Sequence, residues 1–522
     1  MPQRIESRIT RTDFTPEATA GTIPSGATAS WQPIDLNSYS DASVTYDQTA
    51  RSVMTAGRNK KKGSQTDKTA TFGYNIDNAG LNTLAQISSF MFNVPVERGV
   101  TRSILHGASA VTTPRNIIQA KAAGSITLAS TGAALFTTND IIVLLDGVND
   151  RTPLKVSGAV TTSVPFTPLN AGAALDIAST LPARARLARV GRVITESLSL
   201  QGAADKVTLT ATALNWSTLN LKIGEWIHVG GDNGFFAGVE PFYARISAIN
   251  GLVLTFDSTT RPISTVAVAA TNVEIFYGHF VSNGDTAISF THARYFGKDD
   301  NNKHLREFFT GCFASEMAIN FEEKALVTCD FTYNCMDGLM LAMDDATHVA
   351  QFSTMLEEYT DAGISTVTDI VRQRIAVQKA GVVNPAAIHG FIKSGTINVN
   401  NNLTMESAQG VLGSIGAAVG DFDASGSVSA YFIDSQAVDA IRCNCTVGMD
   451  IITARANSGF VLDMPAFTLG NGAITLEKGQ SAMIDLDQAA FGSSKFGYTL
   501  SYTYFPYLPK KAMPVASSAC DC

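Results

Sequence analysis

The sequence predicts a mainly β fold with a duplicated strand–helix unit and two small inserted β-barrels. In residues Ala70–Phe92, apolar side chains alternate with polar ones as far as Ile76, which is typical of a strand buried on one face. From Leu81 the apolar spacing becomes helical, and Asp77 or Asn78 is the expected N-cap. The helix is therefore predicted to lie back on its own strand.

A second copy of this unit is predicted at Ser427–Cys443, 357 residues further along. The first copy's Tyr74, Ile76, Asp77, Leu81 and Leu84 are matched by Tyr431, Ile433, Asp434, Val438 and Ile441. Internal similarity of this kind is evidence for a duplicated domain, although agreement over so short a window also arises by chance.

Length and composition limit the classes of protein. A chain of 522 residues predicts two to four domains. Charged residues make up 16%, against roughly 25% in typical domains, so we expect much of the surface to be covered by copies or partners. A β-rich secreted protein is the alternative. A net charge of −8 does not fit a basic nucleic-acid binder.

Targeting signals are not apparent. The first residues lack the apolar region of a signal peptide, and the longest apolar run, Ile141–Leu145, is too short to cross a bilayer. The sequence therefore predicts a soluble protein made in the cytoplasm and no membrane partner.

The N-terminal third is predicted to contain two extended features. Residues 1–30 read as an arm that orders only against another surface. Residues Gly57–Lys68 form the basic tip of a hairpin that leads into the Ala70 strand. This tip is either a solvated loop or a finger that docks on an acidic surface of a neighbouring subunit; its basic residues are Arg58, Lys60, Lys61 and Lys62.

Residues 103–200 and 201–281 are predicted to be two small, SH3-like β-barrels inserted into the first domain. Asn250-Gly251 between apolar runs is a strong hairpin signal. A run of arginines has two explanations, a basic stripe or a solvated strand edge; its members are Arg184, Arg186, Arg189 and Arg192.

The first domain, residues 31–102, is expected to resume at 282–336, with an antiparallel hairpin across the turn near Glu322–Lys324. Residues 337–395 are assigned as a connector. A second domain spans 396–508, with a half-buried strand at Phe496–Tyr504. Residues 509–522 are a flexible tail.

No catalytic or cofactor-binding constellation is present in the sequence. It has no GxSxG, HExxH, phosphate-loop or dinucleotide motif. Glu322 and Glu323 are adjacent, so on a strand they face opposite ways and cannot share a substrate. We therefore predict no enzyme, no cofactor and no metal.

The seven cysteines have three interpretations. Cys443 and Cys445 lie on the predicted repeat helix, with Cys445 on its buried side, and Cys520 and Cys522 lie at the C-terminus. Inert thiols are one interpretation, and a four-thiolate zinc site is a second that the spacing disfavours. The third is inter-subunit disulfides formed by Cys520, Cys522 and Cys443.

Three segments resemble the tail tube (major tail) proteins of long-tailed bacteriophages. They are GRNKKKG running into ATFGYNIDN, the FTGCFASEMAINF…VTCDFTY hairpin, and INVNNNLTMES…GSVSAYFIDSQAV. The resemblance covers most of the chain outside 103–281. It implies a β-sandwich or barrel-like domain with a flanking helix, closing into rings that stack as a tube in the virion.

In this family six domains make a ring, so a duplicated chain would need three subunits with pseudo-sixfold symmetry. The resemblance implies itself, the tape-measure protein, passing DNA, and tail terminator and baseplate or tip proteins as partners. We expect a mildly acidic bore lined by residues such as Asp485 and Asp487, and the inserted barrels on the outside. The alternative is a non-tubular virion or surface β-protein with adhesive barrels.

Overall fold

The structure is a computed structural model of the chain, and the prediction of a mainly β fold is confirmed. It describes residues 11–24, 31–51, 61–78, 80–105, 116–170, 172, 174–182, 185–203, 205–263, 268–298, 303–343, 363–379, 381–455 and 458–514.

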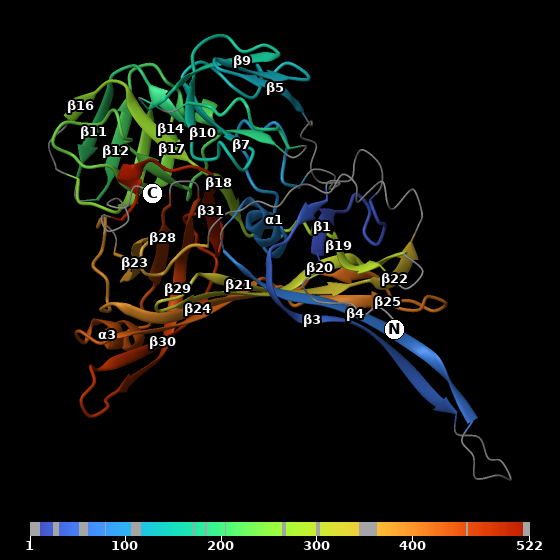
Figure 1. The fold of residues 1–522 in the computed structure, drawn as a ribbon. Helices are drawn as coiled ribbons and strands as arrows, with labels where there is room; N and C mark the ends of the chain where they lie inside the picture. Colours follow the sequence, from blue (N-terminus) through green and yellow to red (C-terminus); the bar gives the residue numbers. More distant parts are fainter. Residues whose placement is uncertain are drawn as a thin grey trace.

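Eight antiparallel strands form one layer at the base of the molecule, which we call the lower sheet (Figure 1). Its apolar side chains face helix α1 and its polar side chains face away from it. In spatial order the strands are β3 (Leu36–Arg51), β4 (Lys61–Asp77), β21 (Thr328–Cys335), β20 (His304–Glu322), β24 (Ile392–Asn400), β27 (Asp423–Tyr431), β30 (Met483–Ala490) and β29 (Gly459–Thr475).

Two predicted hairpins are confirmed in this layer. β20 and β21 pair across the turn that contains Lys324, with Ile319 opposite Cys329. β3 and β4 form a long hairpin that projects from the body (Figure 1). β4 already begins at Lys61, before the predicted start at Ala70, so Lys61 and Lys62 lie on a strand.

The long strands β20 and β29 continue beyond the lower sheet into further strands that pack above it. The first half of β20 pairs with β19 (Phe290–Lys298) and β22 (Asp337–Met343), and β1 (Arg11–Pro16) and β2 (Gln32–Pro33) follow. The first half of β29 pairs with β31 (Ser501–Phe505) and β28 (Val447–Thr453), followed by β18 (His279–Ser282) and β23 (Ile370–Val377). A separate hairpin joins β25 (Thr404–Ser407) and β26 (Ser414–Ala418).

Three chain segments are built into the fold more closely than expected. Residues 11–16 of the expected arm form β1, and Phe14 is fully buried. Strand β31 starts at Ser501 and is buried on both faces, so the prediction of a half-buried strand from Phe496 is wrong. In the C-terminal segment, a 3-10 turn (Lys510–Ala512) packs on the insertion, where Tyr243 Oη donates to Ala512 O at 3.1 Å.

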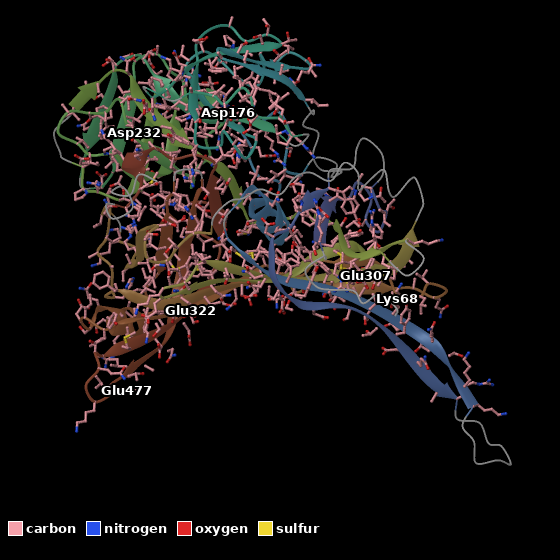
Figure 2. All side chains as sticks on the ribbon, viewed as in Figure 1. Lys68, Asp176, Asp232, Glu307, Glu322 and Glu477 are labelled. Carbon is pink, nitrogen blue, oxygen red and sulfur yellow. A yellow bond between two sulfur atoms is a disulfide. The ribbon has the colours of Figure 1, made fainter. Side chains whose placement is uncertain are left out.

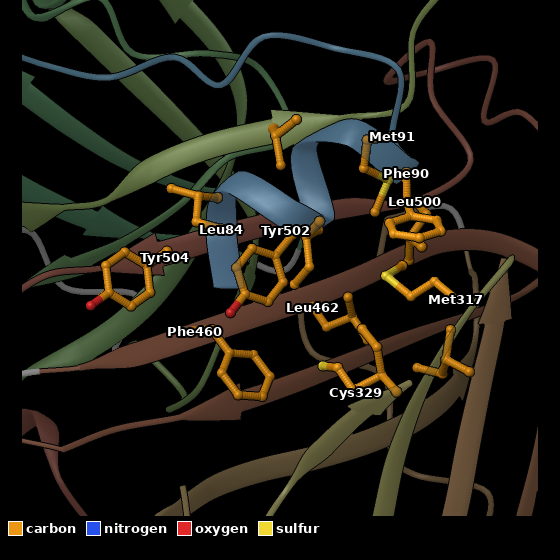
Figure 3. Packing of buried hydrophobic residues seen from close by; sticks show 14 of the residues in the cluster. Leu84, Phe90, Met91, Met317, Cys329, Phe460, Leu462, Leu500, Tyr502 and Tyr504 are labelled. Carbon is orange, nitrogen blue, oxygen red and sulfur yellow. The ribbon is translucent and has the colours of Figure 1, made fainter. Parts of the chain in front are cut away.

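Helix α1 (Leu81–Phe90) lies between the lower sheet and the insertion, and buried residues surround it (Figure 3). The predicted N-cap is wrong: Gly80 takes this position without a side-chain hydrogen bond. Asn78 is buried instead, and its Oδ1 accepts from Tyr502 Oη at 2.9 Å. Because α1 is covered on several sides, its sequence has no broad polar face.

Helix α3 (Gln436–Arg442) follows β27 as α1 follows β4, but the predicted register of the second copy is wrong. Tyr431 and Ile433 are 38% and 57% exposed, whereas Val428 and Ala430 point into the core. A shift by an odd number of residues exchanges the two faces of a strand. Cys443 and Cys445 lie beyond the end of α3, and Cys445 is only half-buried.

The insertion forms one continuous 13-stranded sheet with two apolar cores. The strands are β5 (Ile118–Ala122), β6 (Ser125–Leu128), β7 (Asp140–Leu145), β8 (Pro153–Val156), β9 (Ser163–Pro168), β10 (Arg186–Ile194), β11 (Leu198–Gly202), β12 (Val207–Ala211), β13 (Trp226–Val229), β14 (Phe242–Asn250), β15 (Val253–Thr259), β16 (Val268–Ala270) and β17 (Val273–Tyr277), with a 3-10 turn at Trp216–Leu219. The Asn250-Gly251 hairpin is confirmed. The pairing of β10 with β17 joins the two units, and their SH3-like form stays a prediction.

The arginines of the insertion that the structure describes form neither a basic stripe nor a solvated strand edge. β10 is a central strand, paired with β7 and β17, so it has no solvated edge. Arg189 and Arg192 form ion pairs with the buried Asp140 at 3.4 and 3.3 Å, and Arg186 is itself buried. Arg184 lies outside the described residues.

Buried ion pairs attach the insertion to the rest of the chain. The Arg98 guanidinium donates to both carboxylate oxygens of Glu225, at 2.6 and 2.7 Å, and both side chains are fully buried. Arg245 on β14 pairs with Asp463 on β29 at 3.0 Å. Burial raises the pKa of Asp463 to about 6, although the Arg245 charge lowers it. These contacts attach the insertion to β29 and to the segment that follows α1.

Candidate functional site

Both ends of the lower sheet are unpaired strand edges within the part of the chain that the structure describes. β3 pairs only with β4. Residues 468–475 of β29 pair only with β30. In the single chain, Arg294 Nη2 covers one group of the β3 edge by donating to Ala42 O at 3.2 Å. An exposed edge is a template for pairing with another chain.

The two halves of the lower sheet have the same strand order. The first is β3-β4-β21-β20 and the second is β24-β27-β30-β29, and the pairing of β20 with β24 joins them. The corresponding turns also agree. Asn320 pairs with Thr328 and Thr475 with Met483, and each turn has a left-handed residue, Lys324 (φ 57°) or Gly479 (φ 82°).

This correspondence identifies, for residues of the free β29 edge, the equivalent residues at the internal β20–β24 joint. Ile319 and Phe321 at the internal joint correspond to Ile474 and Leu476 at the free edge. Ile474 is on the core side, opposite the buried Ile484, and Leu476 directly follows the end of β29. Ile319 and Phe321 are 0% and 3% exposed, whereas Ile474 and Leu476 are 42% and 77% exposed. The free edge therefore leaves uncovered two apolar side chains whose counterparts are buried.

The face of the lower sheet that points away from α1 is polar and acidic, and we call it the open face. Glu322 lies on it, on the far side of the sheet from α1 (Figure 2). The polar side chains that give the open face this character include eight carboxylates. They are Asp41, Ser43, Thr45, Asn75, Asp77, Glu316, Asn320, Glu322, Asp330, Thr332, Thr396, Asn398, Asn400, Asp423, Ser425, Ser427, Ser429, Asp485 and Asp487.

A ladder of side-chain hydrogen bonds crosses five strands of the open face. Asn37 Nδ2 donates to Asn75 Oδ1 at 2.9 Å, and Asn75 Nδ2 donates to Asp330 Oδ1 at 2.7 Å. Asn320 Nδ2 donates to Asp330 Oδ2 at 2.7 Å, and Thr396 Oγ1 donates to Asn320 Oδ1 at 3.1 Å. The ladder continues across the β20–β24 joint, so the two halves present one surface.

The structure places the predicted site residues in separate regions. Asp485 and Asp487 lie on the open face, alternating with the buried Ile484 and Leu486. Lys61 and Lys62 lie on the projecting β3–β4 hairpin, while Arg58 and Lys60 lie outside the described residues. The sequence did not indicate the free β29 edge, because whether a strand lies at the edge of a sheet depends on which other strands pair with it.

The cysteines also divide into separate regions. A disulfide joins Cys312 and Cys335 on β20 and β21, which the sequence did not predict. Cys329 is buried, and burial raises the pKa of its thiol well above its ordinary value. Cys443 is exposed beside α3, and Cys520 and Cys522 lie outside the described residues.

Two other kinds of feature are absent from the described residues. No group of His, Cys, Asp and Glu side chains there has the arrangement of a metal site. No helix there is both long and apolar enough to cross a membrane.

In the described part of the chain, one antiparallel layer has two free edges, with exposed apolar residues at one of them, and such edges are templates for pairing with further chains. The sequence matches the family model described as Phage tail tube protein over residues 13–489, so the chain belongs to this family. No curated protein matches the sequence. The family resemblance is confirmed, and the chain is a structural component of a phage tail tube, which implies self-assembly with other tail components.

Proposed function

We propose that the chain contains two tail-tube domains and that three copies close into a ring with pseudo-sixfold symmetry. The repeated strand order and the corresponding turns support the duplication. Strand direction alternates through all eight strands, so β29 of one copy meets β3 of the next antiparallel. Three copies of eight strands make 24, and porins with roughly 16–18 strands already enclose an open channel.

The internal β20–β24 joint also supports a register for this closure. Ala318 pairs with Asn398 and Asn320 with Thr396. The counterparts of these residues on the free edges are Ala473 with Ser43, and Thr475 with Asp41. In this register Ile474 faces Ala42 of the next copy, and its side chain becomes buried as that of Ile319 is.

The open face would line the bore, and stacked rings would form the conduit for the tape-measure protein and later for DNA. Carboxylates such as Asp485 and Asp487 repel phosphates, so DNA passes without adhering. Amide and hydroxyl groups that are already bonded in the ladder add few free donors for a phosphate. The insertion lies on the other side of the sheet, hence outside the tube.

The remaining predicted sites belong to contacts between rings and at the ends of the tube. We propose that the β3–β4 hairpin, with Arg58, Lys60, Lys61 and Lys62, docks on the neighbouring ring, since it projects from the body (Figure 1). The tail terminator and baseplate or tip proteins are the proposed partners at the two ends. Disulfides from Cys520, Cys522 or the exposed Cys443 to a neighbouring subunit stay a proposal.

Negative-stain electron microscopy with mass photometry tests the function. We expect rings or tubes from the purified protein, with a smallest closed species of three 55.3-kDa chains, about 166 kDa. A six-chain ring would retain the tube and overturn the duplication. A protein that stays monomeric at high concentration would favour an adhesive surface protein, for which the exposed apolar side chains of the insertion, such as Ile177, are the supporting observation.

A further inference from the structure

A pocket of about 140 Å³ opens between the start of β3, the end of β4 and the N-terminus of α1. Its lining has an apolar part and a polar part; the apolar residues are Phe14, Ile34, Leu36, Ile76 and Leu81, and the polar ones are Asp35, Asn37, Asp77, Asn82, Thr83 and Gln86. A cavity of about 150 Å³ holds a benzene molecule, so this pocket has the volume for a leucine side chain. It lies at the free edge of β3.

The pocket also has unused hydrogen-bond donors. α1 begins at Gly80 without a side-chain cap or an acidic residue in its first turn. Gln86 is 1% exposed and lines the pocket, and its Nε2 has no hydrogen-bond partner, while its Oε1 accepts from Tyr74 Oη at 2.7 Å. The first-turn amides and Gln86 Nε2 can therefore receive backbone carbonyl groups from an incoming segment.

The proposed ring closure brings one particular segment to this pocket. β29 runs antiparallel to β3 of the next copy, so after Thr475 beside Asp41 its chain continues towards Asn37 and Leu36. The β29–β30 turn, with Leu476, Glu477 and Lys478, then lies at the mouth of the pocket. Glu477 marks this turn at the tip of its hairpin (Figure 2). Leu476 is 77% exposed in the single chain, and its counterpart Phe321 is buried.

The two joints differ in charge at one pair of corresponding turn positions. The β20–β21 turn has Glu322, Glu323 and Lys324 where the β29–β30 turn has Glu477, Lys478 and Gly479, so Glu323 is replaced by Lys478. On the receiving side, β24 carries Lys393, whereas the pocket has Asp35 and Asp77. Charge complementarity of this kind sets register and excludes wrong partners.

We propose that this pocket is the receptor for the β29–β30 turn of the next copy in the ring. Leu476 covers the apolar lining, and Lys478 lies beside Asp35 and Asp77. Because a turn from the first half would bring Glu323 to the same acidic mouth, the contact also enforces the order of the two halves around the ring. This inference rests on the proposed trimeric ring.

Charge reversal and rescue test the contact, with ring formation followed by mass photometry over a range of protein concentrations. We expect Lys478→Glu, and separately the pair Asp35→Lys and Asp77→Lys, to raise the concentration for half-assembly by about tenfold or more. The triple variant should return to within about threefold of wild type. Lys206→Glu, at an exposed position on the insertion, is the matched control and should assemble normally.

Two results would overturn the proposal: normal assembly of Lys478→Glu, or failure of the triple variant to recover while circular dichroism shows all variants folded. Either result, with wild-type rings present, refutes the pocket contact alone. Absence of rings from the wild-type protein refutes the proposed function instead.

Discussion

Replacing Ile474 by Asp should keep the folded chain monomeric. Ile474 is 42% exposed in the single chain, so the substitution leaves the fold intact. In the proposed ring its side chain is buried beside Ala42 of the next copy, as Ile319 is at the internal joint. An unpaired carboxylate at that position costs several kcal/mol at each of three equivalent contacts. Mass photometry should then show only the 55.3-kDa species.

Ile177→Asp is the matched control, because Ile177 is 50% exposed but lies on the insertion. It should form rings and tubes as the wild type does. If Ile474→Asp also forms rings at wild-type concentration, the β29 edge is not the ring interface, and the proposed register is wrong.

Replacing Arg98 by Met should strongly destabilise the attachment of the second inserted unit. Arg98 and Glu225 are both fully buried, and Arg98 also donates to Gly278 O at 2.6 Å. Burial raises the pKa of Glu225, while the Arg98 charge is the main effect that lowers it. Removing the cation leaves a buried carboxylate without its partner, at a cost of about 3–5 kcal/mol.

Urea unfolding followed by tryptophan fluorescence measures this cost, since Trp216 and Trp226 are both buried in the second unit. The double variant Arg98→Met and Glu225→Leu should recover most of the lost free energy of unfolding, because it replaces the buried pair by apolar groups. Equal destabilisation by the single and double variants would mean that packing, not charge, explains the loss.

Local patterns in the sequence were sufficient for the strands and the hairpins. Alternation around Ile319 and Cys329 predicted the β20–β21 hairpin, and Asn250-Gly251 predicted the turn between β14 and β15. The register of the second copy could not be predicted in this way. Tyr431 is an aromatic residue that faces solvent, and the structural counterpart of the buried Tyr74 is Val428. Matching Tyr431 to Tyr74 therefore shifted the comparison by three residues, an odd number that exchanges the two faces of the strand.

Features that depend on long-range pairing were not accessible from the sequence. The Cys312–Cys335 disulfide requires the register of two strands, and the joined sheet of the insertion requires the contact of β10 with β17. One pattern in the sequence did point to the candidate interface. Asn320–Lys324 and Thr475–Gly479 follow the same pattern, each with an apolar residue then a glutamate before the left-handed position. Comparing these turns would have indicated the duplication in its correct register.

Covalent trapping of the β3–β29 contact is the sharpest test of ring closure by strand pairing. In a background with Cys443, Cys445, Cys520 and Cys522 changed to Ser, the pair Ser43→Cys and Ala473→Cys places two thiols opposite each other. Antiparallel partners are about 4.5–5.5 Å apart at Cα, which suits a disulfide. The control pair Val44→Cys and Ala473→Cys points to opposite faces of the sheet.

After mild oxidation of assembled tubes, we expect the first pair to convert the monomer into a covalent three-chain species on a non-reducing gel, and the control pair to leave it monomeric. Well-formed tubes whose Ser43→Cys and Ala473→Cys chains stay monomeric, or close as six-chain rings, would rule out the trimeric ring joined at these two strands.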